Sequence, residues 1–186
     1  NSLLADVYVR YIASRILAHS AGEFGTVGEY GKPAVLHQDE FHFNFSHSGK
    51  CVAIAWGSAE LGVDIEQLKP ADDLHNVALR VFTDTEINYL NSFSGREQLS
   101  AFYKLWTLKE SIMKAAGKGF YLHPQSFNIV SEGETVDSVE VEGRRWYIRA
   151  FTPDVDYIVS LALQEPEFPD DVEIIPEHTA VERILR

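Results

Sequence analysis

The chain lacks several features that would place it in common classes of protein. It has one cysteine, Cys51, in 186 residues, which excludes an intrachain disulfide framework and fits a reducing, cytosolic compartment. No apolar run approaches the roughly 20 residues that a helix needs to cross a bilayer, and no basic, apolar and small-residue signal segment opens the chain. The sequence therefore predicts a cytoplasmic protein that does not enter a membrane.

Positive charge is also scarce. Sixteen Lys and Arg residues face 28 Asp and Glu residues, which gives a formal net charge of −12. This balance argues against broad nucleic-acid binding, which needs many cationic contacts to phosphates, but it leaves room for one local cationic pocket. The apolar content of 45% indicates a substantial core, and the length suits one domain or two small lobes that share an interface.

The first third of the chain combines one helical pattern with three strand patterns. Residues 3–18 place apolar side chains near one helical face. FHFNFSH, 41–47, alternates apolar and polar side chains, CVAIAW, 51–56, is continuously apolar, and LGVDIE, 61–66, follows a short turn. Three strands joined by short turns predict an antiparallel meander.

The remainder of the chain starts with helical signals and ends with strands. Thr83 and Glu86 have the spacing of a capping box. A longer helix is predicted over about 97–116, with Gly117 at the position just beyond its end. Strands are predicted at 127–130, 136–142, 145–151 and 157–163, with EGRR as a hairpin turn, before a tail with a short extended piece and a short helix.

This order of elements predicts an α+β fold with antiparallel sheets. The two halves look alike in plan, each with a helix and about three strands, although no sequence repeat supports a duplication. We expect two pseudo-symmetric lobes, an N-terminal lobe at 1–60 and a C-terminal lobe at 61–186, with the seam near 57–61. Because the chain begins at Asn1 rather than Met, the N-terminal lobe is expected to be incomplete.

Two carboxylates interrupt the apolar rhythm of LGVDIEQL, 61–68. Asp64 and Glu66 are two positions apart on a predicted strand, so they share a face about 6–7 Å apart. Such a pair repels unless a cation such as Mg²⁺, which prefers oxygen ligands, lies between the two groups. The alternative is a solvated strand end, which is the commoner explanation when this pattern stands alone.

A second set of charged residues lies on the predicted long helix. Glu110 and Lys114 are four apart and share a helical face, with Lys109 one step round. Such a pair is often an ordinary surface pair worth about 0.2–0.5 kcal/mol. Here it borders an aromatic-rich apolar stripe, and Lys109, Lys114 and Lys118 form a cationic cluster in an acidic protein. A cationic cluster beside metal ligands suits a polyphosphate.

The turn SHSGK, 46–50, offers hydroxyls, an imidazole and amides that suit phosphate, although a plain polar turn explains it equally well. A nucleophilic role for adjacent Ser46 and His47 is disfavoured, because neighbours in a hairpin do not readily bond as nucleophile and base. A zinc site is disfavoured by the absence of His/Cys ligand spacing. Lys32, in GKP, is a surface lysine by default.

Five motifs in one order decide between these alternatives. They are EYGKP (29–33), FNFSHSG (43–49), GVDIE (62–66), FTDTE (82–86) and WTLKESIMKAAGKG (106–119). Together they resemble the 4′-phosphopantetheinyl transferases, in particular the larger two-lobed type, and the resemblance covers essentially the whole chain. It implies two pseudo-symmetric α+β lobes, with coenzyme A (CoA) and Mg²⁺ in the cleft between them, in a monomer. It also implies that a serine of an apo acyl or peptidyl carrier protein attacks the β-phosphorus of CoA and that 3′,5′-ADP leaves.

The resemblance also implies roles for the acidic residues and one lysine. Asp64, Glu66 and Glu110 would hold the Mg²⁺ that bridges the pyrophosphate. Glu110 would also be the general base, directly or through a water, and Lys114 would stabilise charge on the transferring phosphate. Some relatives carry another carboxylate at the position of Ile65, so here Glu110 becomes the needed third ligand.

The same resemblance implies a binding site for CoA. Lys109, together with Lys114, would bind the pyrophosphate, and the 3′-phosphate would be held by Lys32, Ser46 and His47. The family normally has basic residues upstream of the position of Asn1, and this sequence does not contain them.

Two other functions remain open at this stage. The chain could be a non-catalytic relative that binds CoA or a carrier protein, or a metal-dependent hydrolase that releases phosphopantetheine from CoA without a carrier. Since carrier proteins of this kind are usually acidic, a partner with net charge −12 must receive them through local apolar or basic patches. GKGFYL, 117–122, is the predicted patch.

Overall fold

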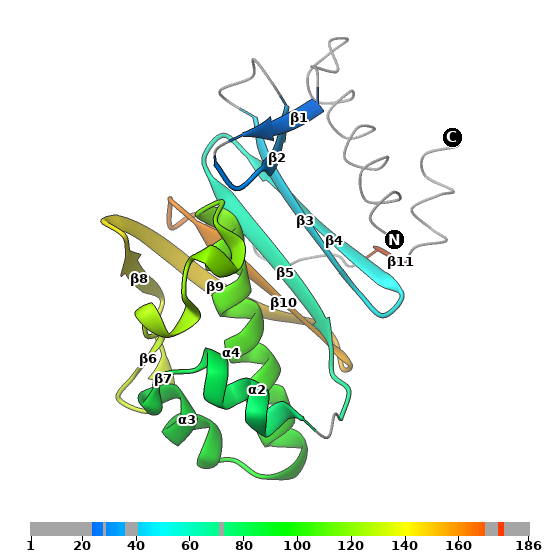
Figure 1. Ribbon diagram of the computed structural model, residues 1–186. Helices are drawn as coiled ribbons and strands as arrows, with labels where there is room; N and C mark the ends of the chain where they lie inside the picture. Colours follow the sequence, from blue (N-terminus) through cyan, green and yellow to red (C-terminus); the bar gives the residue numbers. More distant parts are fainter. Residues whose placement is uncertain (1–23, 28, 36–40, 71–72, 170–174, 177–186) are drawn as a thin grey trace.

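The protein has an α+β fold, as predicted, in which helices pack beside small antiparallel sheets (Figure 1). The computed structural model describes residues 24–27, 29–35, 41–70, 73–169 and 175–176. The predicted helices at 3–18 and in the C-terminal tail lie outside the described residues. The predicted pseudo-symmetry of two lobes includes the first of these helices, so it remains a prediction.

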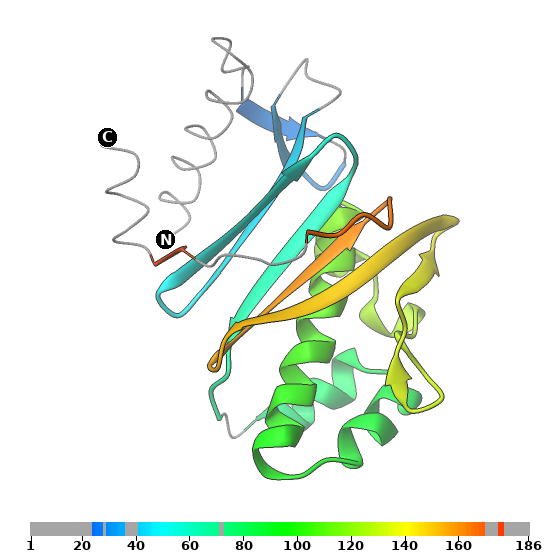
Figure 2. The same cartoon turned by 180° about the vertical axis from the view of Figure 1, so that it is seen from behind.

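The largest described sheet carries the long helix on one face. Its strand order is β5 (Leu61–Gln67), β10 (Tyr157–Leu163), β9 (Arg144–Asp154) and β8 (Ser138–Val141), and all neighbours are antiparallel. Helix α4 (Gly95–Ala115) crosses this sheet and contacts β5, β10 and β9 (Figure 1). The view from behind shows the other face, where β9 and β10 pass in front of α4 (Figure 2).

A second sheet contains β3 (His42–Ser48) and β4 (Cys51–Gly57), with the two-residue strand β11 (Ile175–Pro176) on the outer edge of β4. The turn between β3 and β4 contains Gly49, whose φ of +59° lies in the left-handed region that glycine adopts without strain. A separate hairpin joins β1 (Phe24–Val27) to β2 (Lys32–Val35).

The prediction of a three-stranded meander is wrong at its third strand. Strand β5 leaves the sheet of β3 and β4 and pairs over its full length with β10. Residues 61–65 are all buried, so this strand needs neighbours on both faces, and the edge of a small half-exposed sheet would not provide them. The chain thus changes sheet between β4 and β5, near the predicted seam, while the lobe boundaries themselves remain a prediction.

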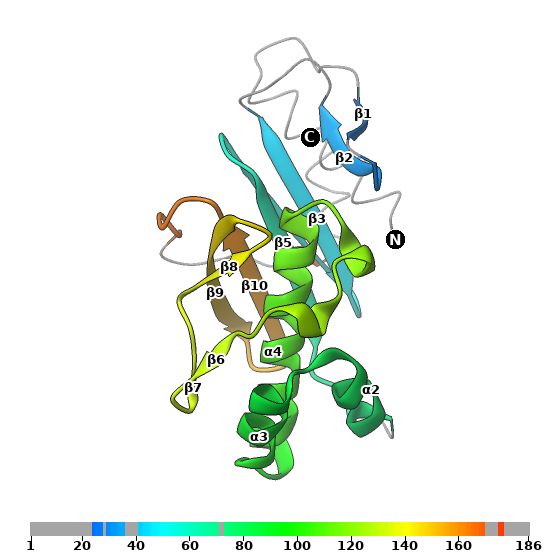
Figure 3. The same ribbon diagram turned by 60° about the vertical axis from the view of Figure 1, so that its left-hand side comes forward.

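Strands β3 and β5 nevertheless lie side by side and run in the same direction (Figure 3). Polar side chains of β3 join them. The amide of Val63 donates to Asn44 Oδ1 at 2.9 Å, and the amide of Gln67 donates to Ser48 Oγ at 3.1 Å. These bonds satisfy backbone donors of β5 that face β3 instead of a ladder strand.

The described helices match the sequence signals, with one addition. Helix α3 (Asp84–Asn91) begins with the predicted capping box of Thr83 and Glu86. Helix α4 ends within one residue of the predicted position, and the amide of Gly117 closes its last turn onto Lys114 O at 3.0 Å. Helix α2 (Leu74–Val81) was not predicted; Asp73 stands at its N-cap but makes no side-chain cap hydrogen bond, and its first turn has no acidic residue. Two short 3-10 helices follow α4, η1 (Gly119–Tyr121) and η2 (Pro124–Ser126).

The later strand predictions are confirmed in part. Strand β10 has the predicted bounds, and β9 contains the predicted strand within a longer one. The EGRR turn is confirmed, with φ of +51° at Glu142 and +74° at Gly143. The strand predicted at 127–130 is reduced to β6 (Val130–Ser131), which pairs with β7 (Glu134–Thr135). Next to this short ladder, the amide of Val136 donates a hydrogen bond to Ile129 O at 2.9 Å.

The main core lies between α4 and the sheet of β5, β10, β9 and β8. Its fully buried side chains include Leu105, Ile112, Met113 and Trp146. No helix in the described part of the chain is long and apolar enough to cross a membrane. The core thus holds α4, which carries Glu110 and Lys114, against the sheet that contains β5, which carries Asp64 and Glu66.

Candidate active site

The predicted acidic residues of β5 and α4 meet in one pocket of about 330 Å³ between β3, β5 and α4. Strand β3 contributes Phe45, Ser46 and His47, β5 contributes Asp64 and Glu66, and α4 contributes Trp106, Glu110 and Lys114. The pocket therefore brings together all three predicted acids, the predicted catalytic lysine and two of the predicted phosphate-binding residues.

The backbones of β5 and α4 approach each other closely at Gly62, and this contact brings the charged residues of the two elements together. A Cβ atom added to Gly62 would lie 2.1 Å from Ser111 O and 2.5 Å from the amide nitrogen of Ala115. Only a residue without a side chain fits at this contact. Because Gly62 lies two residues before Asp64, and Ser111 directly follows Glu110, the contact fixes the charged residues of the two elements next to each other.

Asp64 is the central acceptor of the pocket. Its Oδ1 atom accepts from Lys114 Nζ at 2.6 Å and from Ser46 Oγ at 2.7 Å, and Lys114 Nζ also donates to Ser46 Oγ at 2.9 Å. Burial raises the pKa of Asp64, while the charge and hydrogen bond of Lys114 oppose that rise. Ser46 is thus committed to the carboxylate and lysine, although it was predicted to hold a phosphate.

Glu66 lies on the same face of β5 and is held by Ser48. Ser48 Oγ donates to Glu66 Oε2 at 2.6 Å. Burial raises the pKa of Glu66 and the charge of Asp64 adds to the rise, whereas hydrogen bonds from Ser48 and the indole of Trp106 lower it.

Glu110 is the third acid of the pocket, and its carboxyl group also has a raised pKa. Burial raises its pKa to about 7, with a further rise from the charge of Asp64 and, to a smaller extent, of Glu66, while Lys114 acts in the opposite direction. A carboxyl group with this pKa exchanges its proton near neutral pH, which is the property required of a general acid or base.

The pocket fits a divalent cation by its chemistry. Three carboxylates face one lysine, and Asp64 Oδ2 is buried with no hydrogen-bond partner among the described residues. An unpartnered buried carboxylate oxygen costs free energy, and a cation would remove that cost. As the side chains stand, however, no three His, Cys, Asp or Glu residues in the described part of the chain are arranged to hold a metal ion by themselves.

Some residues of the pocket were not assigned to it from the sequence. Phe45 and Trp106 were assigned only to apolar faces. Ser48, which does not line the pocket but donates to Glu66, was included only as a member of the SHSGK turn. A helical signal for Trp106 did exist, because it lies four residues before Glu110 and eight before Lys114 and so shares their face. Ser46 and Ser48 were noted in the SHSGK turn as donors to a phosphate, but no local pattern shows that they bond to Asp64 and Glu66, because these partners belong to another sheet.

The structure does not bring Lys109 to the pocket. Its side chain is fully buried, and Nζ pairs with Glu86 Oε1 at 3.0 Å and donates to Pro124 O at 2.7 Å and Phe127 O at 2.8 Å. Burial lowers the pKa of Lys109, and Glu86 opposes that fall. Since these three acceptors use all three ammonium protons, Lys109 does not face a pyrophosphate here, contrary to the prediction.

Lys32 is also absent from the lining of the pocket and is not a free surface lysine. Its Nζ donates to the Glu60 carboxylate, to Leu61 O at 3.1 Å and to Ala115 O at 3.0 Å. Of the three residues predicted to hold the 3′-phosphate, only His47 has an exposed side chain that also lines the pocket.

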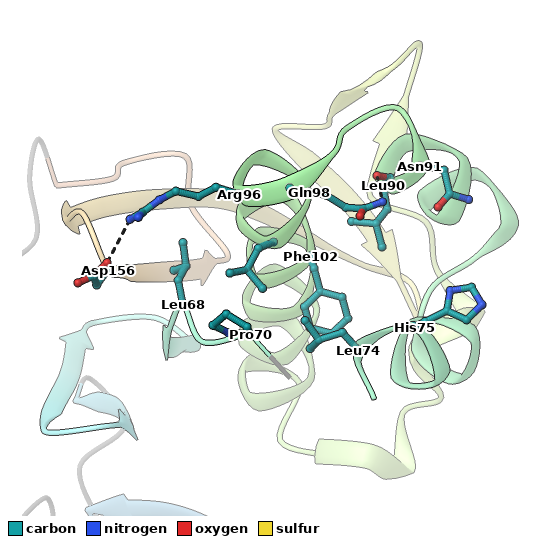
Figure 4. A pocket seen from close by; sticks show the side chains of 12 residues that line it. Leu68, Pro70, Leu74, His75, Leu90, Asn91, Arg96, Gln98, Phe102 and Asp156 are labelled. Atoms are coloured by element: carbon teal, nitrogen blue, oxygen red, sulfur yellow. Dashed lines mark hydrogen bonds and ion pairs between the residues drawn. The ribbon is translucent and has the colours of Figure 1, made fainter. Parts of the chain in front are cut away.

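A second hollow, of about 530 Å³, lies near the N-terminal end of α4 (Figure 4). Leucines from several elements and Phe102 point into it, and Arg96 bridges its rim to Asp156 at 3.1 Å. It contains none of the predicted site residues. The predicted docking segment 117–122 lies elsewhere and exposes Phe120 and Tyr121, with the Phe120 ring 6.3 Å from that of Trp106.

The fold and the first pocket define a class of protein. An α+β scaffold that gathers three carboxylates and a lysine at one point has the groups that phosphoryl-transfer enzymes use. The family model of the 4′-phosphopantetheinyl transferase superfamily matches residues 60–162, which include β5, α4 and β10. The chain belongs to the 4′-phosphopantetheinyl transferase superfamily, which confirms the resemblance seen in its motifs.

Individual relatives agree with the family. The chain is 36% identical to the 4′-phosphopantetheinyl transferase Sfp of Bacillus subtilis over 94% of this chain and 78% of the relative. It is 30% identical to the 4′-phosphopantetheinyl transferase psf-1 of Bacillus pumilus over 98% of this chain and 79% of the relative. The 4′-phosphopantetheinyl transferase AcpT of Salmonella typhimurium is 36% identical over 60% of this chain and 55% of the relative.

Proposed function

We propose that this protein transfers 4′-phosphopantetheine from CoA to a serine of an apo acyl or peptidyl carrier protein, with Mg²⁺ as the required metal. The observation that carries the proposal is the single pocket in which Asp64, Glu66, Glu110 and Lys114 meet. All four residues lie within the segment that the family model matches.

The reaction forms one bond and breaks one bond at phosphorus. The serine oxygen of the carrier bonds to the β-phosphorus of CoA, and the bond from that phosphorus to the bridging oxygen of the pyrophosphate breaks. The products are the phosphopantetheinyl carrier and 3′,5′-ADP, and the serine proton passes to a base of the protein. Such a transfer depends mainly on alignment of the groups and on neutralisation of the developing charge.

Asp64, Glu66 and Glu110 are the residues that would hold the metal. Mg²⁺ is usually bound by one or two carboxylates, with waters and substrate phosphates completing the shell, so a preformed three-carboxylate cage is not required. The buried Asp64 Oδ2, which has no partner among the described residues, is the most available oxygen. When bound, the metal would draw charge from the pyrophosphate oxygens.

Lys114 supplies the positive charge of the site. Its ammonium group is oriented by Asp64 and Ser46, and its side chain is 26% exposed, so it can meet a phosphate oxygen at the pocket. It would stabilise charge on the transferring phosphate. His47, also at this pocket, is the remaining donor proposed for a phosphate of CoA.

Glu110 is the proposed general base. Burial raises its pKa to about 7 in the metal-free protein, and its carboxylate lines the pocket, where it would accept the serine proton directly or through a water. The same burial that raises this pKa makes the ionised carboxylate a stronger base than an exposed one.

The test is a transfer assay with the intact protein. CoA, Mg²⁺ and an apo carrier protein are incubated with it, and the carrier mass is measured. We expect one phosphopantetheine to be added to one serine, and removal of Mg²⁺ by a chelator to stop the reaction. Absence of any addition across acyl and peptidyl carriers would contradict the proposal.

Two controls separate transfer from the other functions. Release of phosphopantetheine from CoA without a carrier would indicate a hydrolase. Binding of CoA that is indifferent to Mg²⁺, without turnover, would indicate a non-catalytic relative. The meeting of Asp64, Glu110 and Lys114 in one pocket favours transfer over simple binding, because binding alone does not need a perturbed base.

A further inference from the structure

Lys32 makes three polar contacts outside the pocket, and they join segments that lie far apart in the sequence. It lies on β2, near the start of the printed chain, yet it bonds to residues 28, 29 and 83 positions away. Its side chain is only 9% exposed, and its stem lies beside Gly117, whose missing Cβ would be 3.4 Å from Lys32 Cδ.

The three acceptors leave no free proton on this lysine. An ammonium group has three donors, and Glu60, Leu61 O and Ala115 O each take one. A phosphate could reach Lys32 only by displacing the Glu60 carboxylate or by lying beside it, and two neighbouring anions repel each other. The geometry therefore disfavours Lys32 as a ligand of the CoA 3′-phosphate.

The acceptors belong to the two elements that carry the reactive groups. Leu61 is the first residue of β5, three residues before Asp64. Ala115 is the last residue of α4, directly after Lys114, and its carbonyl is one of those that a helix end leaves without an intrahelical partner. A cation at this end of a helix also interacts favourably with the helix dipole.

We propose that Lys32 is a positioning residue for the transfer reaction, which bridges the start of β5 to the end of α4 and thereby holds Lys114 and Glu110 against Asp64. The inference rests on the proposed function. The contact that Lys32 closes lies beside Gly62, where the backbones of the two elements approach closely. Glu60 acts as the counter-ion that keeps the ammonium group oriented.

The experiment compares two donors, CoA and 3′-dephospho-CoA, in the wild type and in Lys32→Met. A positioning role predicts that kcat falls by the same factor with both donors, about 10- to 100-fold for a misplaced reactive group, while KM for each donor changes little. A 3′-phosphate contact predicts instead a loss confined to CoA, of about 10- to 100-fold in kcat/KM for one charged hydrogen bond. That second result would overturn the inference.

Two further variants control for charge and folding. Lys104→Met removes the same charge from a part of α4 that faces Glu134, and it should leave kcat with both donors unchanged. Glu60→Gln keeps an acceptor oxygen for Lys32, so the preference for CoA over 3′-dephospho-CoA should not change. If Glu60→Gln instead raises that preference, the carboxylate competes with a phosphate and the inference is wrong.

Amide hydrogen exchange provides a readout that does not depend on turnover. Lys32→Met should speed exchange at the amides of Ala116, Gly117 and Lys118, which close the last turn of α4. Unchanged exchange there, or a lower melting temperature with a wild-type kcat for the folded protein, would contradict the positioning role. Absence of turnover in the wild type would count against the proposed function alone.

Discussion

The properties of single residues in this pocket come from their neighbours rather than from their type. Glu110 has a pKa near 7 because α4 buries it beside two other acids, and Lys114 offsets only part of this effect. Asp64 receives both the lysine and a serine on one oxygen and leaves the other without a described partner. The carboxylates are thus held in an unfavourable state that a cation would relieve.

Glu110 should make the metal-free protein less stable as the pH rises. Its folded pKa lies above the ordinary value of 4.5, so the folded state keeps a proton that the unfolded state has lost, and stability falls between about pH 4.5 and pH 7. Melting temperatures measured from about pH 5 to about pH 8 should show a steeper decline in the wild type than in Glu110→Gln. Parallel declines would contradict the raised pKa.

Asp64 should be required for transfer but not for folding. Asp64→Asn removes the charge that binds the metal and orients Lys114, so we expect kcat to fall by about 10²- to 10³-fold, as when a principal electrostatic group of a site is lost. Carrier mass analysis measures the loss, and circular dichroism checks the fold. Asp84→Asn, at an exposed aspartate of α3, is the matched control and should retain activity.

At the scale of elements, the contact between α4 and β5 decides whether the site exists. The helix sits on the strand at Gly62, and the buried pair of Thr107 and Ser160 joins the same helix to β10 at 2.7 Å. A helix so closely seated cannot slide or rotate without separating the charged residues of the pocket.

Gly62→Ala should damage both stability and activity. The new methyl group would meet backbone atoms of α4 at distances below 3 Å, so the helix must shift, at a cost of about 1–3 kcal/mol for an overpacked contact. Urea unfolding measures the loss of stability, and the transfer assay should show a lower kcat for the folded protein. Gly57→Ala is a milder comparison, because its Cβ would meet only the end of the Leu61 side chain at 3.3 Å.

The buried pair of Lys109 and Glu86 belongs to the architecture of the helices. It joins α4 to the cap of α3 and to the segment around η2, with the ammonium 4.4 Å from the centre of the Phe127 ring. Removal of one partner leaves a charge buried without compensation. We therefore regard Lys109 as a residue that stabilises the fold.

Lys109→Met should lower the free energy of unfolding by about 3–5 kcal/mol, the usual cost of breaking a buried pair. CoA affinity of the folded variant should not change, because Lys109 does not line the pocket. Unfolding curves and isothermal titration of CoA check the two statements. The double variant with Glu86→Gln should cost less than the sum of the single variants. A loss of CoA affinity without a loss of stability would restore the pyrophosphate role.

At the scale of the whole molecule, the site lies where two sheets meet. β3 comes from one sheet and β5 from the other, and side-chain hydrogen bonds of Asn44, Ser46 and Ser48 join the two strands. Cys51 and Ala53 of β4 also pack with Val63 and Ile65 of β5 in one apolar cluster. A ligand that binds at this junction should therefore stabilise the molecule as a unit.

Mg²⁺ should raise the melting temperature, and more so at about pH 8 than at about pH 6, because the carboxylates must lose their protons to bind it. The sign follows from the raised pKa values of Asp64, Glu66 and Glu110. Thermal unfolding with and without the metal measures the effect, and Asp64→Asn should reduce it. If Mg²⁺ raises the melting temperature of the wild type and of Asp64→Asn by the same amount, the metal does not bind at Asp64.

The sequence alone predicts the local elements well. The capping box of α3, the end of α4, the EGRR turn and strand β10 each depend on residues within a few positions of one another. The order of the motifs was also sufficient for the family, and the shared face of Asp64 and Glu66 follows from the strand period alone. Local propensity and periodicity carry this information because they involve no distant partner.

Only the tertiary structure decided which groups meet. In the structure, β5 pairs with β10, and Lys109 is buried in the core beside Glu86. Lys32 donates to carbonyl groups of both β5 and α4 and so joins the two elements. Glu110 and Asp64 are 46 positions apart in the printed sequence, and no local rule places them together. Glu110 and Asp64 meet because α4 packs against β5 at Gly62. Burial of apolar surface favours this packing, and the absence of a side chain at Gly62 allows the close contact that fixes how the two elements are arranged.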